Sequence, residues 1–232
     1  MQKLLKAAAV LAATILTAVS LTACSTTASE ASSITVVVHD SVSVSKELLA
    51  SFTKQNGIEV KLLKAGDAGA MTNKLVLTKD APIGDAVYGI DNTFAGIADK
   101  NKIIDGSLTA IDYGDVCMNF DKTWFATNEQ AAPTSIKDLI KPEFDGLTVV
   151  ENPNTSSTGL AFLAATVSVF GEKGWQSYWQ ALKNNNVKIA AGWEDAYYTD
   201  FSGSSGKGKY PIVLSYSSSP ADEVRDNGES QT

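Results

Sequence analysis

The sequence is poor in the residues on which most hydrolases and metal sites depend. It contains one histidine and two cysteines in 232 residues. It has neither a Gly-x-Ser-x-Gly motif nor a His/Cys group with zinc-site spacing. An enzyme would therefore need a carboxylate pair or an unaided serine, so a hydrolase is the least favoured class. We predict no catalytic residues, no metal and no cofactor.

Basic residues are fewer than acidic ones: the chain has 19 Lys and Arg and 26 Asp and Glu, which gives a net charge of −7. This balance argues against a nucleic-acid partner. Hydrophobic residues make up 44% of the chain, which is enough for one substantial core or two smaller ones and is typical of a globular protein. Cys117 lies in a short apolar run, where we interpret it as a small buried hydrophobe without a disulfide partner.

The longest apolar run, residues 7–21, follows a basic start at the N-terminus. Residues 1–23 therefore have the pattern of an export signal. The sequence Leu-Thr-Ala-Cys24 resembles the bacterial lipobox, in which the cysteine is acylated and becomes the mature N-terminus. An ordinary signal with an incidental cysteine is the alternative. Residues 24–33 form a polar tether, so we expect an exported, lipid-anchored protein facing the periplasm or cell exterior.

In the first half of the chain, β-branched runs alternate with helical periods. Strands are predicted at 34–38, 58–63 and 85–90, and helices at 45–56, 71–77 and up to residue 97. This alternation predicts an α/β fold with parallel pairing. Ligands of such sheets lie beyond the carboxyl ends of the strands, which directs attention to Asp40, Ser41, Asp91 and Asn92.

The pattern restarts after a predicted strand at 113–120. A short helix capped at 134–135, a strand at 147–150, helices at 160–170 and 175–184, and strands at 187–190 and 211–214 follow. We expect Trp175 and Trp179 in the core and a flexible loop at 202–209. These elements predict one lobe at 34–115, a second at 116–215, and a crossover with a tail at 216–232.

Two further stretches carry candidate ligand-binding side chains. Ser156, Ser157 and Thr158 precede an apolar helix, where free backbone N–H groups and hydroxyls can receive an anion or a hydroxyl group; simple helix capping is the alternative. Trp193 and Tyr197 lie one helical turn apart if residues from 194 on are helical. They could form a wall for a flat cationic ring, or be a core pair at a helix start.

Six motifs in order resemble the thiamine-binding proteins of bacterial ABC importers. The resemblance runs from about residue 35 to residue 221 and rests on these stretches: Val-His-Asp-Ser41, Tyr-Gly-Ile-Asp-Asn92, Ile-Asp-Tyr-Gly-Asp115, Asn-Pro-Asn-Thr-Ser-Ser-Thr-Gly159, Gly-Trp-Glu-Asp-Ala-Tyr197 and Leu-Ser-Tyr-Ser-Ser-Ser-Pro-Ala221. It implies a two-lobed periplasmic-binding-protein fold of type II. Such a monomer would close on thiamine or its phosphate esters and deliver it to a membrane permease.

The resemblance assigns roles to individual positions. It places Asp40, Asp91 and Asn92 at the strand ends, and the hydroxyls of residues 156–158 at the hydroxyethyl or phosphate end of the ligand. It places four residues around the rings: Trp193, Tyr197, Tyr216 and Ser219. The chain departs from the family at 42–46 and at Asp222. Family members also continue beyond the equivalent of Thr232 to complete the first lobe, so we expect this sequence to be truncated.

Two rival functions remain beside thiamine capture and hydrolysis. The Tyr197-Tyr198 pair could ligate ferric iron in a protein of the same fold. Adjacent helical residues point about 100° apart, however, so only one easily faces a given site. The other rival is a lipoprotein with a purely structural or interaction role.

Overall fold

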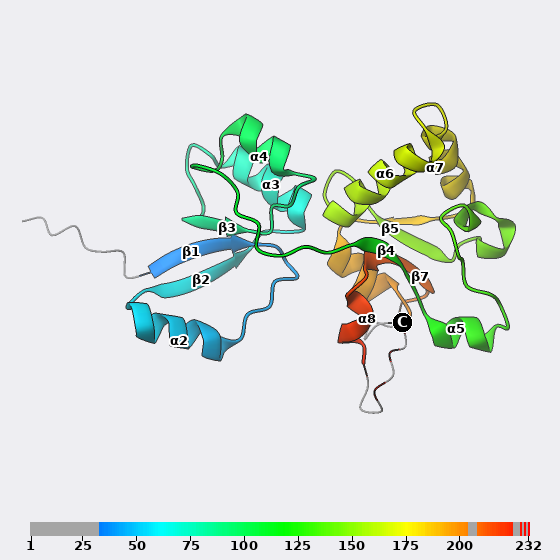
Figure 1. Ribbon diagram of the computed structural model, residues 1–232, viewed down its shortest axis with the longest axis horizontal. Helices are drawn as coiled ribbons and strands as arrows, with labels where there is room; N and C mark the ends of the chain where they lie inside the picture. The colour runs from blue at the N-terminus through cyan, green and yellow to red at the C-terminus, as the bar shows by residue number, and fades with distance from the viewer. Residues whose placement is uncertain (1–32, 204–207, 225–227, 229, 231) are drawn as a thin grey trace, which may run out of the picture.

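The protein forms two α/β units joined by an extended segment (Figure 1). In the computed structural model, residues 33–203, 208–224, 228, 230 and 232 are described. The predicted signal, Cys24 and most of the tether lie outside them. We call the elements from β1 to α4 the first unit and those from β4 to α8 the second unit. Within the described residues, no helix combines the length and the apolar character needed to cross a membrane.

The first unit is a three-stranded sheet with helices on both faces. Its strands, in the order β2-β1-β3, are all parallel, as predicted. Helix α2 covers one face, and α3 and α4 cover the other (Figure 1). The elements are β1 (Ser33–Val38), α2 (Lys46–Asn56), β2 (Glu59–Lys64), α3 (Ala68–Leu77), β3 (Ala86–Tyr88) and α4 (Ala95–Asn101).

Helix α2 begins and ends where the sequence predicts. The Ser45 hydroxyl accepts a hydrogen bond from Leu48 N, and Gly57 ends the helix in the left-handed conformation. The apolar face of the helix is not buried, because Leu48 is 63% exposed and Phe52 40% exposed. The periodicity therefore predicted the helix correctly, although it does not find a covering partner for that face within the described residues.

The second unit is built on a mixed sheet. Its strand order is β4-β7-β5-β6, and β4 pairs with β7 in the antiparallel direction. The expectation of parallel sheets is therefore wrong for β4, which enters from the long connection instead of a helical crossover. The elements are β4 (Val116–Phe120), α5 (Lys122–Thr127), η1 (Asp138–Ile140), η2 (Pro142–Phe144), β5 (Thr148–Glu151), α6 (Ser157–Phe170), α7 (Trp175–Asn184), β6 (Lys188–Ala190), η3 (Asp195–Asp200), β7 (Ile212–Tyr216) and α8 (Ser219–Asp222).

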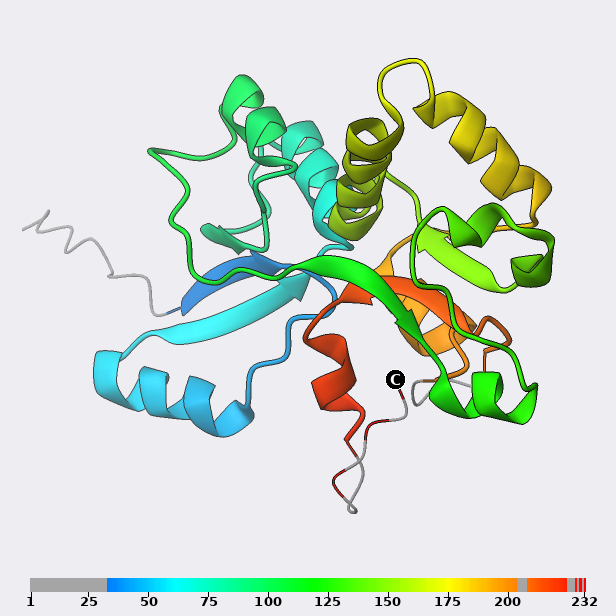
Figure 2. The same ribbon diagram turned by 45° about the vertical axis from the view of Figure 1, so that its right-hand side comes forward.

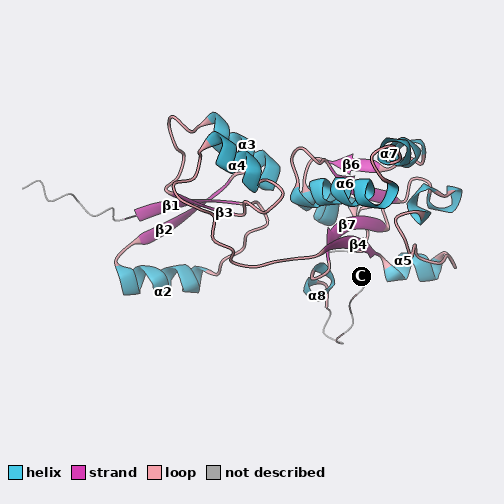
Figure 3. Cartoon of the chain, turned by 45° about the horizontal axis from the view of Figure 1, so that its top comes forward, coloured by secondary structure: helices cyan, strands magenta, loops and turns pink. Residues whose placement is uncertain are grey.

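Both faces of this second sheet are buried (Figure 3). Along β5 and β7, alternate side chains enter opposite cores: Val150 and Leu214 pack under α6 and α7, whereas Val149 and Val213 pack against η3. Period-two alternation with apolar residues on both faces explains why these strands are continuous hydrophobic runs.

Three local predictions need correction. The helix predicted after residues 134–135 is only the 3-10 turn η1; the Ser135 hydroxyl accepts from Lys137 N before it, and the Asp138 carboxylate accepts from Thr134 N and Ser135 N. Helix α7 buries Tyr178 and Leu182 most deeply, while Trp175 and Trp179 are half-buried. Cys117 is also half-buried instead of enclosed. Part of the predicted loop at 202–209 lies outside the described residues.

The buried face of α7 gives a test of the core that lies under α6 and α7. Leu182 is fully buried, so Leu182→Ala should lower the free energy of unfolding by about 2–5 kcal/mol. Ile189, half exposed on β6, is the matched aliphatic control, and Ile189→Ala should change it by less than about 1 kcal/mol. Urea titration followed by circular dichroism measures both, and equal losses would contradict this division between core and surface.

Candidate functional site

The two units touch where the start of α3 meets the loop before α6 (Figure 2). Gly69 N and Ala70 N both donate to Thr155 O, at 3.0 and 3.1 Å. These amides lie in the first turn of α3, where no intrahelical acceptor is available. A Cβ on Gly69 would come within 2.8 Å of the Thr155 carbonyl carbon, so this close backbone contact requires glycine.

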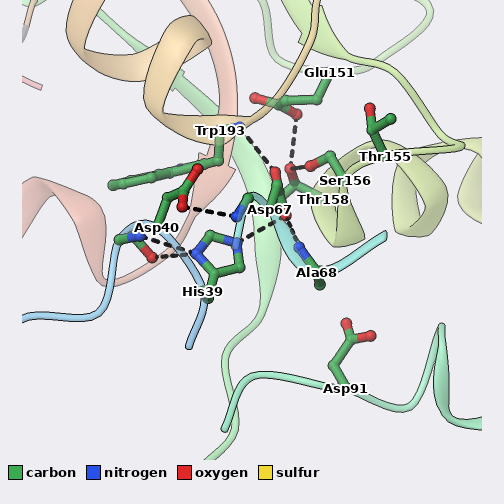
Figure 4. Close-up of polar contacts among 12 residues, drawn as sticks. His39, Asp40, Asp67, Ala68, Asp91, Glu151, Thr155, Ser156, Thr158 and Trp193 are labelled. Carbon is green, nitrogen blue, oxygen red and sulfur yellow. Dashed lines mark hydrogen bonds and ion pairs between the residues drawn. The ribbon is translucent and has the colours of Figure 1, made fainter. Parts of the chain in front are cut away.

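Asp67 joins the units through its carboxylate (Figure 4). Its Oδ1 accepts from Ala68 N at 2.6 Å, as the N-cap of α3, and from His39 Nε2 at 2.8 Å. Its Oδ2 accepts from Trp193 N, in the second unit, at 2.9 Å. Burial raises the pKa of Asp67, but hydrogen bonds from His39, Ser156 and Trp193 outweigh burial, so the net pKa lies below its usual value.

Asp40 and Ser41 stand beside this cluster and shape its loops. Asp40 Oδ1 accepts from Gly66 N at 2.8 Å, and its carbonyl accepts from the Lys64 ammonium. Ser41 N donates to His39 Nδ1 at 3.0 Å, which leaves His39 Nε2 to carry the proton that points at Asp67.

A second buried carboxyl lies across from Asp67, at the end of β5. Glu151 Oε2 is 2.8 Å from Thr158 Oγ1, which is 2.9 Å from Ser156 Oγ (Figure 4). All three residues are buried, and Glu151 Oε1 has no hydrogen-bond partner among the described residues. Burial raises the pKa of Glu151 to about 8, with a further contribution from the nearby charge of Asp67, although the Thr158 hydroxyl opposes the rise.

Beside this cluster lies a pocket of about 380 Å³ between the units. The predicted residues Asp91, Asn92, Ser157 and Tyr216 line it, together with Asp115. The Asp91 Oδ1 atom caps the turn before α4, accepting from Thr93 N and Phe94 N, while these contacts leave Oδ2 unused. None of the described lining residues is a lysine or an arginine.

Tyr216 experiences the negative charge of this region most directly. Burial raises the pKa of its hydroxyl far above the usual value, and four carboxyl groups add to the rise: Asp67, Asp91, Glu151 and Asp112. Its ring centroid lies 6.3 Å from that of Trp193, so the pocket wall continues into an aromatic cluster.

Trp193 and Tyr197 stack on each other, with centroids 5.0 Å apart and planes 12° apart. Tyr197 lies in the π-helix η3, which begins two residues after Trp193. Tyr197 is 1% exposed and Trp193 8% exposed. Trp193 Nε1 donates to Ser215 Oγ, which is bonded to Ser219 Oγ. Tyr197 and Ser219 therefore lie behind the Trp193 ring, where Tyr197 belongs to the core that packs against η3 and Ser219 is buried beside it.

The structure thus divides the predicted site residues into four groups. Four line the pocket, and Trp193 with the hydroxyls of 156 and 158 lies in the buried cluster around Asp67. Asp40 and Ser41 bond within the loops beside that cluster. Tyr197 and Ser219 support that cluster from the core. The sequence reasoning missed Asp67 and Glu151. Each lies at or just beyond the carboxyl end of a strand, so the rule that selected Asp40 and Asp91 would have found both.

Two sheet-based units with a polar site between them define a class of protein, the two-lobed solute-binding proteins with the type II fold. Residues 82–225 match the family of bacterial extracellular solute-binding proteins, and the chain belongs to that family. A solved "periplasmic thiamin binding protein" has a similar structure, with a TM-score of 0.69 and 24% identity over 84% of this chain and 65% of that one. Iron-bound HitA from Pseudomonas aeruginosa has the same fold, with a TM-score of 0.55 and 16% identity over 79% of this chain and 62% of that one.

Relatives with similar sequences include thiamine-binding periplasmic proteins. The Escherichia coli protein is 28% identical over 215 residues, which cover 84% of this chain and 64% of that protein. The Brucella suis protein is 26% identical over 210 residues, which cover 82% and 60%. The chain therefore spans less than two thirds of the length of these relatives.

The shared Asp67 carboxylate gives a second test. In Asp67→Asn an amide N–H₂ would face one of three N–H donors, so the variant should lose about 1–3 kcal/mol of stability near neutral pH. Because the Asp67 pKa is lowered in the folded protein, its contribution is present above the usual value of 3.8 and is lost as the pH falls further.

The stability difference between parent and Asp67→Asn should therefore shrink on acidification below pH 3.8. Thermal unfolding across the acid range measures it. Asp105→Asn, at an exposed position, should match the parent throughout. A constant difference between Asp67→Asn and the parent at every pH would show that the carboxylate charge contributes nothing.

Proposed function

We propose that the protein captures thiamine or one of its phosphate esters outside the cytoplasm. One observation carries this proposal: the pocket between the units holds carboxylates and an aromatic ring, with no lysine or arginine among its described lining residues. A cationic ring is the ligand that such a wall favours, because both carboxylates and aromatic faces attract positive charge. The thiazolium ring of thiamine is such a cation, and similarity to thiamine-binding relatives supports the choice.

The proposed roles follow from position. Tyr216, with Trp193 beside it, supplies aromatic surface for the rings, each contact contributing about 0.5–2 kcal/mol. Asp91 supplies the countercharge through Oδ2. Ser157 lies in the first turn of α6 and lines the pocket. Its hydroxyl and the free backbone N–H groups of this helix N-terminus would receive the hydroxyethyl or phosphate end of the ligand.

Ferric iron is the alternative ligand within the same fold. The tyrosine pair that suggested it does not converge on one point, since the Tyr197 and Tyr198 rings are perpendicular. Tyr197 is buried in the core that packs against η3, whereas Tyr198 is 41% exposed. The geometry of this tyrosine pair therefore supports an iron site less well than the pocket supports a site for an organic cation.

The remaining assignments belong to the same proposal. Residues 34–115 and 116–215 act as two lobes that close on the ligand, with 216–232 at the crossover. The protein works as a monomeric carrier without catalysis and delivers its ligand to an ABC permease. Acylated Cys24 holds it on the outer face of the cell membrane.

Binding can be tested by calorimetry with thiamine. Trp193→Ala should weaken binding about tenfold or more, the equivalent of a desolvated cation-π contact. Asp91→Asn keeps the Oδ1 cap of its turn, so the local fold should survive. It should weaken thiamine far more than a neutral analogue without the thiazolium charge.

Trp179→Ala is the matched control for tryptophan loss. Its indole donates to Thr166 Oγ1 and packs against the core under α6 and α7, so its loss should lower stability and leave affinity unchanged. If calorimetry shows no thiamine binding while ferric iron binds tightly, the ligand assignment fails and the solute-binding fold stands.

The anchor has its own test. An acyl chain contributes about 0.8 kcal/mol per buried CH₂, so the mature protein should fractionate with membranes, and Cys24→Ala should release it. Ser25→Ala, next to the acylated position, should leave the protein on the membrane. Identical soluble fractionation of the parent and Cys24→Ala would contradict lipidation.

A further inference from the structure

The charged side chains in the pocket wall all carry the same sign. Among the described residues that line the pocket, only Asp91 and Asp115 are charged. Asp91 follows β3 in the first unit, and Asp115 ends the extended segment that joins the two units (Figure 1). A ligand between the units therefore meets two carboxylates and, within the described wall, no cationic side chain.

The Asp115 carboxylate is free to act on a ligand. Its backbone carbonyl accepts from Ser217 N at 2.8 Å, but no hydrogen bond or ion pair joins its carboxylate to another described residue. Its charge nevertheless reaches the wall: burial raises the pKa of the Cys117 thiol, and the charge of Asp115 raises that pKa further. Because Cys117 also lines the pocket, Asp115 acts on the space that a ligand would occupy.

Most of the hydroxyl groups at the start of α6 are committed elsewhere. Thr158 Oγ1 donates to Glu151 Oε2 at 2.8 Å, and Ser156 Oγ lies 2.9 Å from Thr158 Oγ1. Both hydroxyl residues are buried, and neither is among the described residues that line the pocket. Ser157 is the one of the three that does so. This stretch therefore offers the ligand one hydroxyl, which is enough to hydrogen-bond an alcohol.

A phosphate group needs more than this wall supplies. A phosphate monoester has a charge of about −1.5 to −2 at pH 7 and three acceptor oxygens, which proteins pair with Arg, Lys or several N–H groups. The N-terminus of α6 contributes the equivalent of about half a positive charge. That is less than the charge of either carboxylate in the wall. A neutral hydroxyethyl group meets no such repulsion.

We propose that the pocket selects organic cations that carry no phosphate group, and that Asp115 is a residue that determines this charge selection. The inference rests on the proposed function and narrows its ligand to thiamine itself instead of its phosphate esters. Thiamine brings a positive ring to two carboxylates. An ester brings the same ring together with a phosphate, whose negative charge the carboxylates repel. Ser157 then receives the hydroxyl of the hydroxyethyl group.

Calorimetry with thiamine and thiamine monophosphate tests the charge selection. At low ionic strength the parent should bind thiamine about tenfold or more tightly than the monophosphate, and added salt should narrow the difference. Asp115→Asn should weaken thiamine and strengthen the monophosphate, so the ratio of their affinities should fall about threefold or more. Asp105→Asn removes an exposed acid of the same connecting segment and should keep the parent's ratio. Because both ligands are compared on one protein, a change in stability leaves the ratio unaffected.

The Cys117 thiol reports the charge of the wall without thiamine. In Cys24→Ala it is the single thiol of the chain. Its thiolate attacks a methanethiosulfonate, forms a disulfide and releases methanesulfinate, and the reagent can carry a trimethylammonium or a sulfonate group. The ratio of the two rates is independent of the thiol pKa, because both reagents meet the same thiolate. Relative to 2-mercaptoethanol, Cys117 should favour the cationic reagent about tenfold or more. Adding Asp115→Asn should lower this ratio, whereas adding Asp105→Asn should not.

The two experiments separate the charge selection from the ligand. If thiamine binds and the monophosphate binds equally well, thiamine capture stands and the charge selection is wrong. If neither binds and Cys117 still favours the cationic reagent through Asp115, the ligand assignment fails and the selection for cations stands. A Cys117 ratio equal to that of 2-mercaptoethanol, or one that Asp115→Asn leaves unchanged, would overturn the charge selection.

Discussion

The contact between the units depends on one carboxylate that is shared by groups from both. Asp67 caps α3, pairs with His39 and accepts from Trp193 N. A buried carboxylate is costly unless donors surround it. The backbone of the second unit provides one of those donors, so Asp67 is fully satisfied only when the units are together. Stability of the first unit and closure against the second are therefore linked through the same side chain.

Much of the fold could be predicted because its signals are local. The β-branched runs, the Ser45 cap and the left-handed Gly57 each determine structure within a few residues of themselves. The antiparallel direction of β4 and the exposure of Leu48 depend on what packs nearby in space, which periodicity cannot show. The π-helix is a similar case, since its sequence fits an ordinary helical turn.

The candidate site was predicted in its location more than in its geometry. The strand-end rule selected Asp91 and the family resemblance selected Tyr216, and both residues line the same pocket. The rule does not say which carboxyl is solvated, which is capped and which is buried. Burial raises the pKa of both Asp67 and Glu151, but hydrogen-bond donors and His39 outweigh it at Asp67 alone, so the two pKa values move in opposite directions.

The distribution of charge explains how these acids coexist. Asp67, Asp91, Glu151 and Asp112 all act on Tyr216, whereas His39 is the single basic side chain bonded within the buried cluster that is drawn in Figure 4. Repulsion among the acids must be relieved by pairing, by capping or by protonation. His39 relieves Asp67, and the turn before α4 holds one oxygen of Asp91. Burial and the nearby charge of Asp67 raise the pKa of Glu151, and the remaining acids leave negative charge facing the pocket, where a cation would reduce it.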